Sequence, residues 1–127
     1  MPAALLLSAE MAELPRLAEW LDGRIDALGL DDRQAYAVRL CIDELAGNVL
    51  MHSGAQSLRV TIEAPPLTLL IEDDGPAFDP RGVAEPALPA SLDDARPGGL
   101  GLMLARRWSQ GLDHARVDGW NRVTVTF

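Results

Sequence analysis

Three side chains that can do chemistry follow one another at intervals of four residues in the segment 41–53. They are the carboxylate of Glu44, the amide of Asn48 and the imidazole of His52. Because a helix turns by about 100° per residue, this spacing keeps them on one side of a helix, at the border of its apolar stripe. A half-buried carboxylate beside a half-buried amide is costly unless a polar group lies against them. The segment alone leaves two interpretations open: a ligand site, or polar residues that are satisfied at the edge of the core.

Two further polar clusters follow along the chain. Asp73-Asp74-Gly75 comes directly after an apolar run, and a glycine-rich turn opens a later helical segment. A carboxylate at a strand end can accept a hydrogen bond from an adenine amino group, while a glycine-rich turn before a helix offers backbone N–H groups to phosphates. The amide oxygen of Asn48 can join phosphate oxygens and waters around Mg²⁺. The glycine-rich turn consists of Gly98, Gly99, Leu100, Gly101 and Leu102.

The composition excludes several other kinds of site. The chain has 127 residues, which predicts a single domain over 1–127, and a net charge of −8, which argues against a nucleic-acid partner. All eleven basic residues are Arg, so a phosphate loop that ends in Gly-Lys-Ser/Thr and Schiff-base catalysis are both excluded. No apolar run approaches the roughly 18 residues of a membrane span, and we expect a cytoplasmic protein.

The elements that must position these clusters follow from the spacing of apolar residues. Intervals of three and four predict helices over 13–29, from Asp31 or Asp32 to 53–54, and from Gly98 to Gly111. Cys41 falls in the apolar stripe of the second helix and is expected to be a small buried hydrophobe.

Alternation of apolar and polar residues predicts the strands. The predicted strands are 3–8 at an edge, 57 to the prolines at 65 and 66, 67–72, 112–118 and 122–127, with a turn at 119–121. The segment 76–97 shows no period and predicts a long mobile loop of functional importance. This order of elements predicts an α+β domain with two layers, in which three helices cover one face of a mostly antiparallel sheet.

In their order and spacing, the three clusters resemble the boxes of the GHKL, or Bergerat, ATP-binding fold of gyrase, histidine kinases and MutL. Glu44-x3-Asn48-x3-His52 resembles the N box, Asp73-x-Gly75 the G1 box and the glycine-rich turn the G2 box. The stretches DELAGNVLMH and DDGPAFDP, with the closing Gly-x-Asn before the final strand, are more closely similar to bacterial anti-sigma regulatory factors, which are small serine protein kinases. The resemblance covers about 14–127.

The resemblance implies a role for each matching residue. It makes Glu44 the general base or water orienter, Asn48 the Mg²⁺ contact and Asp73 the adenine acceptor beside Gly75, with the glycine-rich turn on the phosphates. His52, at the end of the N box, would position the loop or the phosphates, or is simply a satisfied helix-end histidine.

Roles can also be predicted for three residues outside the motif positions. Arg96, just before the glycines, is a candidate phosphate contact with a solvated loop cation as its alternative. We expect Asp74 to be a solvated neighbour and Phe78 to serve packing.

The function that follows is a cytoplasmic, ATP- and Mg²⁺-dependent serine kinase. It would phosphorylate a STAS-type anti-anti-sigma protein, which competes with an RNA polymerase sigma factor for the same surface, and a homodimer is compatible with the resemblance. Two alternatives stay open: a non-catalytic module that uses ATP to shape a partner-binding face, and a kinase of this fold whose target is not linked to sigma. Glu44 favours an enzyme, because a pure binding module needs no base.

Overall fold

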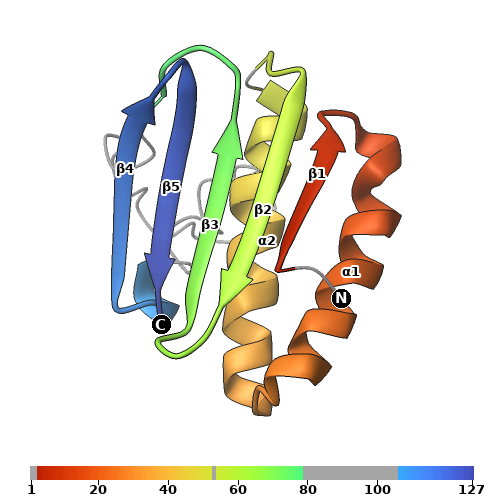
Figure 1. Cartoon of the computed structure of the whole chain (residues 1–127), viewed down its shortest axis with the longest axis vertical. Helices are drawn as coiled ribbons and strands as arrows, with labels where there is room; N and C mark the ends of the chain where they lie inside the picture. Colours follow the sequence, from red (N-terminus) through yellow and green to blue (C-terminus); the bar gives the residue numbers. More distant parts are fainter. Residues whose placement is uncertain (1–2, 53, 79–105) are drawn as a thin grey trace, which may run out of the picture.

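The computed structural model describes residues 3–52, 54–78 and 106–127, without the side chain of His52. Five antiparallel strands form one sheet in the order β1-β2-β3-β5-β4. Figure 1 shows α2 lying behind β2 and β3, and α1 beside β1. The strands are β1 (Ala4–Ser8), β2 (Ser57–Glu63), β3 (Thr68–Asp73), β4 (Gly111–Val117) and β5 (Trp120–Thr126), and the helices are a 3-10 turn (Met11–Glu13), α1 (Leu14–Leu28) and α2 (Asp32–His52). The predicted α+β class and antiparallel sheet are confirmed.

The helix-covered face of the sheet carries the core. Each central strand alternates, and the register keeps the buried residues of neighbouring strands opposite one another: Val60 pairs with Ile71, and Leu58 pairs with Asp73. Val60 and Leu58 are fully buried. Because side chains alternate between faces, Asp73 points to the same side as the core residues that precede it in β3. The end of β3 thus delivers a carboxylate to the helix-covered face.

Specific residues set the ends of the two helices. Gly29 adopts a left-handed conformation with φ of 63° and ends α1, as the sequence predicts. Before α2, the Asp31 carboxylate accepts the backbone N–H of Gln34 at 2.8 Å, and the Gln34 side chain accepts that of Asp31 at 3.1 Å. This reciprocal pair satisfies two N–H groups at the helix start and makes Asp31 the cap. Cys41 is fully buried, as predicted, and burial raises the pKa of its thiol to about 12.

The last hairpin turns earlier than the sequence prediction of 119–121. Asp118 and Gly119 form a two-residue turn with φ of 51° and 83°, and Val117 pairs directly with Trp120. Positive φ at both central residues matches the twist of a tight hairpin, and Asp-Gly is a favoured pair for it. Trp120 and Asn121 therefore belong to β5. This shift places Asn121 on the helix-covered face, opposite Asp73.

The third predicted helix is described only at its end. Residues 106–108 are helical, whereas 79–105, including most of the predicted loop and the glycine-rich turn, lie outside the described residues. Trp108 meets Tyr36 of α2 edge to face, with ring centroids 4.9 Å apart, and the Arg33 guanidinium lies 4.9 Å from the centre of the Trp108 ring. These contacts fix the end of this segment against α2. In the described parts of the chain, no helix is long and apolar enough to span a membrane.

Candidate functional site

The helix α2 holds the first predicted cluster at the border of the core. Leu45 and Ala46 are buried, whereas Glu44 and Asn48 are half-buried and Asp43 is exposed. This is the placement that the helical spacing predicts, because the two polar side chains flank the apolar stripe without entering it. Their roles as base and metal contact stay predictions.

Glu44 combines burial with a missing hydrogen bond. Its Oε2 atom is buried, and no group among the described residues donates to it. Burial raises the pKa of the Glu44 carboxyl, and the neighbouring charge of Asp43 raises it further. A buried carboxylate oxygen without a donor is costly in a folded protein and is therefore a feature that needs an explanation. A group with these properties is suited to accept a proton.

Asp73 occupies the last position of β3 and is 6% exposed. Its Oδ1 accepts two hydrogen bonds, from the backbone N–H of Gly75 at 2.9 Å and from Nδ2 of Asn121 at 3.2 Å. Both bonds fall on the same oxygen. Among the described residues no group donates to Oδ2, and this oxygen can accept a hydrogen bond from a ligand.

Asp74 stays partly exposed, as expected of a solvated neighbour, but its carboxylate also has partners within the fold. Its Oδ1 accepts the backbone N–H groups of Gln56 at 2.8 Å and Ser57 at 2.9 Å. The hydrogen bond from Ser57 is the largest cause that lowers the pKa of the Asp74 carboxyl; burial acts to raise this pKa, and the bond from Gln56 lowers it further. Asp74 therefore joins the end of β3 to the start of β2. The adjacent acids Asp73 and Asp74 thus bind different partners.

Asn121 is a further residue beside the candidate site, and in the sequence it stands out only as the end of the closing Gly-x-Asn. It is 2% exposed. Its Nδ2 donates to Asp73 and, at 2.8 Å, to the carbonyl of Pro76, while its Oδ1 accepts the N–H of Phe78 at 3.1 Å. The signal is present in the sequence, because Asn121 continues the buried alternation of Val123 and Val125. The predicted turn at 119–121 included Asn121, and this error hid the alternation.

Two other residues complete the turn after Asp73. Arg116 of β4 donates to the carbonyl of Gly75 at 2.7 Å, so the hairpin β4–β5 holds this turn from a second point. Phe78 does not pack as expected: the residue is 51% exposed, and its backbone N–H makes the hydrogen bond to Asn121. The expectation failed because the backbone of Phe78, and not its ring, is what the sheet holds.

The structure brings some predicted residues to one side of the sheet and leaves others undescribed. Glu44 and Asn48 on α2, and Asp73 with Gly75 after β3, share the helix-covered side, and α2 packs against β3. The side chain of His52 lies outside the described residues, as do Arg96, Gly98, Gly99, Leu100, Gly101 and Leu102.

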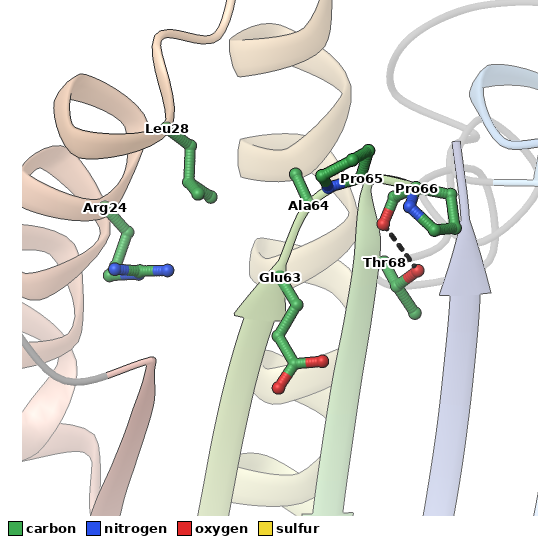
Figure 2. Close-up of a pocket in the computed structure, with 7 residues that line it drawn as sticks. All are labelled: Arg24, Leu28, Glu63, Ala64, Pro65, Pro66 and Thr68. Atoms are coloured by element: carbon green, nitrogen blue, oxygen red, sulfur yellow. Dashed lines mark hydrogen bonds between the residues drawn. The ribbon is translucent and has the colours of Figure 1, made fainter.

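A separate hollow lies at the opposite end of β3, beside the turn between β2 and β3 (Figure 2). None of the predicted site residues lines it, and a hydrogen bond within it joins the Thr68 hydroxyl to the carbonyl of Pro66. The hollow is lined by Arg24, Leu28, Glu63, Ala64, Pro65, Pro66 and Thr68.

Comparison with known proteins decides the family. Residues 7–127 match the family model of the histidine kinase-like ATPase domain. The chain belongs to this family. A histidine kinase-like ATPase domain binds ATP, and the predicted GHKL fold is confirmed. The chain is also 38% identical over 100 residues to the serine/threonine-protein kinase BtrW of Bordetella bronchiseptica, with 74% of this chain and 70% of that protein covered. Membership and this likeness support a kinase or ATPase activity.

Proposed function

We propose that this histidine kinase-like ATPase domain is a cytoplasmic, ATP-dependent protein serine kinase of the anti-sigma type. It phosphorylates a serine of a STAS-type anti-anti-sigma protein and thereby switches its own binding to a sigma factor or to another regulatory protein. The observation that carries the proposal is the buried Oε2 of Glu44, for which the described residues offer no donor. The name of the relative, a serine/threonine-protein kinase, supports the same reaction class.

Glu44 acts as the general base of this transfer. The serine hydroxyl oxygen attacks the γ-phosphorus of ATP, and its proton passes to the Glu44 carboxylate. The bond between the γ-phosphorus and the bridging oxygen breaks, and ADP leaves with that electron pair. The raised pKa of Glu44 suits this step, because a stronger base takes the hydroxyl proton more readily.

The residues present suit a magnesium ion. Mg²⁺ prefers oxygen ligands and keeps several waters, and Asn48 offers an amide oxygen at the half-buried border of α2. Asn48 would hold the ion together with phosphate oxygens of the nucleotide. When bound, Mg²⁺ neutralises charge on the transferred phosphoryl group. Because the chain carries a net charge of −8 and ATP is an anion, nucleotide binding without the ion should be weak.

Asp73 supplies the adenine contact in this proposal. Its Oδ2 accepts a hydrogen bond from the adenine amino group, while Oδ1 stays bound to Gly75 and Asn121. The glycine-rich turn Gly98–Gly101, with Arg96 and His52 as further candidates, would contact the phosphates.

The direct test is phosphate transfer from γ-labelled ATP to STAS-domain proteins of the same organism. We expect label on one serine of one such protein, dependent on Mg²⁺. ATP-dependent binding of a STAS protein without transfer would replace the kinase by a non-catalytic binding module. The protein can also be used to capture its partners in the presence of ATP and of ADP. Identification of the partners whose binding differs between the two nucleotides shows whether the partner is a sigma factor or another regulatory protein.

A further inference from the structure

The buried side-chain amide of Asn121 forms hydrogen bonds to several residues of the turn after β3. Asn121 donates from Nδ2 to Oδ1 of Asp73 at 3.2 Å and to the carbonyl of Pro76 at 2.8 Å. Its Oδ1 accepts the N–H of Phe78 at 3.1 Å and lies 3.3 Å from Nε2 of His114. An Asn side chain has two N–H donors and two acceptor positions, and all four are used here.

The orientation of this amide follows from its partners. A carboxylate and a carbonyl can only accept, and both lie at Nδ2, while the backbone N–H of Phe78 can only donate, and it lies at Oδ1. A flipped amide would lose these three bonds. The same assignment requires Nε2 of His114 to carry the hydrogen that it shares with Oδ1. A buried amide with a single satisfied orientation holds its partners in fixed positions.

We propose that Asn121 is the positioning residue of the nucleobase site, and that it makes this site selective for adenine over guanine. The inference rests on the proposed role of Asp73 as the adenine acceptor. By binding Oδ1 of Asp73, Asn121 leaves Oδ2 as the acceptor for the base and fixes the direction in which the carboxylate faces. By binding Pro76 and Phe78, it also holds the backbone that follows.

Selectivity follows from the chemistry of the two bases. At the position where adenine has an amino donor, guanine has a carbonyl oxygen. A fixed carboxylate oxygen accepts from the first and repels the second, because two acceptors then meet without a hydrogen. A carboxylate that can rotate loses part of both effects. Asn121 therefore affects the ratio of ADP to GDP affinity and not only the affinity for ADP.

The test uses the full chain and measures ADP and GDP affinity by calorimetry. Asn121→Asp keeps the shape and the acceptor oxygen but cannot donate to Asp73, whereas Asn121→Ala removes all four contacts. We expect each variant to weaken ADP binding about tenfold and GDP binding by much less, as the loss of a hydrogen bond to a charged group allows. Arg122→Met is the matched control, because Arg122 is the next residue of β5, pairs with Glu72, and should leave both affinities unchanged.

A double-mutant cycle separates positioning from general stability. In the Asp73→Asn background, Asn121→Ala should cost less than about twofold in ADP affinity, because Asn121 acts through the carboxylate that is already absent. Amide exchange of the nucleotide-free chain gives a second readout. The N–H of Gly75 should exchange faster in both Asn121 variants than in Arg122→Met, because its acceptor Asp73 is no longer held. The N–H of Phe78 should exchange faster only in Asn121→Ala, which removes its acceptor oxygen.

The outcomes distinguish this inference from the proposed function. Folded Asn121 variants that bind ADP within about twofold of wild type, or that weaken ADP and GDP equally, would overturn the positioning role while the kinase proposal stands. If Asn121→Ala does not fold, the affinities of the near-isosteric Asn121→Asp decide whether Asn121 has the positioning role. Wild-type chain that binds no ADP in the presence of Mg²⁺ would overturn the proposed function and, with it, this inference.

Discussion

The carboxylate of Asp74 accepts the backbone N–H of Ser57 at 2.9 Å, and this contact joins two segments that are separated by a whole hairpin. A second bond to the N–H of Gln56 extends it. Because these bonds lie next to Asp73, they hold the strand end from which the proposed adenine acceptor projects. In this account, Asp74 supports the proposed site through the backbone and not through the nucleotide.

Asp74→Ala should destabilise the fold by about 1–2 kcal/mol at neutral pH, since two hydrogen bonds to a partly exposed charge are lost. The pKa of Asp74 is lowered in the folded protein, so its contribution is present above the ordinary pKa of 3.8 and is lost as the pH falls through the lower folded value. Urea unfolding of both proteins between pH 7 and pH 3 checks this. A difference that does not shrink in acid would contradict the charged hydrogen bonds as its source.

The Glu72 carboxylate, on the open face of the sheet, should likewise stabilise the fold more at neutral pH than in acid. Its side chain is 8% exposed and lies between Arg59 at 3.1 Å and Arg122 at 3.2 Å. Burial acts to raise the pKa of Glu72, but the hydrogen bonds from both guanidinium groups outweigh it and lower the pKa. Stability from this cluster is therefore present at neutral pH and declines as the pH falls through the lowered value.

Arg122→Met should cost about 1–2 kcal/mol of unfolding free energy at neutral pH, because one partner of a buried charge is removed while Arg59 remains. Arg16→Met is the control, since Arg16 pairs with Glu13 at 58% side-chain exposure and should change stability by less than about 0.5 kcal/mol. Denaturant melts of both variants provide the measurement. Equal effects would mean that burial of Glu72 has no energetic consequence.

Much of this architecture was predictable, because local periodicity determines it. Spacing of four placed Glu44 and Asn48 at the core border of α2, and an apolar run placed Asp73 at the end of a central strand. The role of Asp74 was not predictable, since it depends on the register of β2 against β3. Asn121 was missed because the predicted turn at 119–121 took it out of the strand, although it shares the buried face of Val123 and Val125.

Asn48→Ala should weaken the response of nucleotide binding to Mg²⁺. Removal of the amide oxygen leaves the ion to phosphate oxygens and water, so the gain in ATP affinity on adding Mg²⁺ should fall about tenfold. Calorimetric titrations of ATP with and without Mg²⁺ measure this gain in wild type and variant. An unaltered Mg²⁺ response in a folded variant would remove Asn48 from the site.

Glu44→Gln should leave the fold as stable as wild type at neutral pH, or make it more stable. A raised pKa means that the ionised carboxylate is less favourable in the folded than in the unfolded chain, so stability falls as the pH rises through the folded pKa. The amide of the variant cannot ionise and avoids this loss. Thermal melts across the acid range should show the variant gaining on wild type as the pH increases, whereas a clear loss of stability at neutral pH would indicate that Glu44 is a structural residue.

The most direct test of the kinase proposal is single-turnover phosphate transfer from labelled ATP to a STAS-type acceptor by wild type and Glu44→Gln. The variant keeps the shape but cannot take a proton, so transfer should slow by roughly 10²–10⁴ while ATP affinity barely changes. Asp43→Asn removes only the smaller cause of the raised pKa of Glu44 and keeps the base itself, so it should slow transfer far less than Glu44→Gln does. Transfer by Glu44→Gln at the wild-type rate, with bound ATP unchanged, would contradict the assignment of Glu44 as the base.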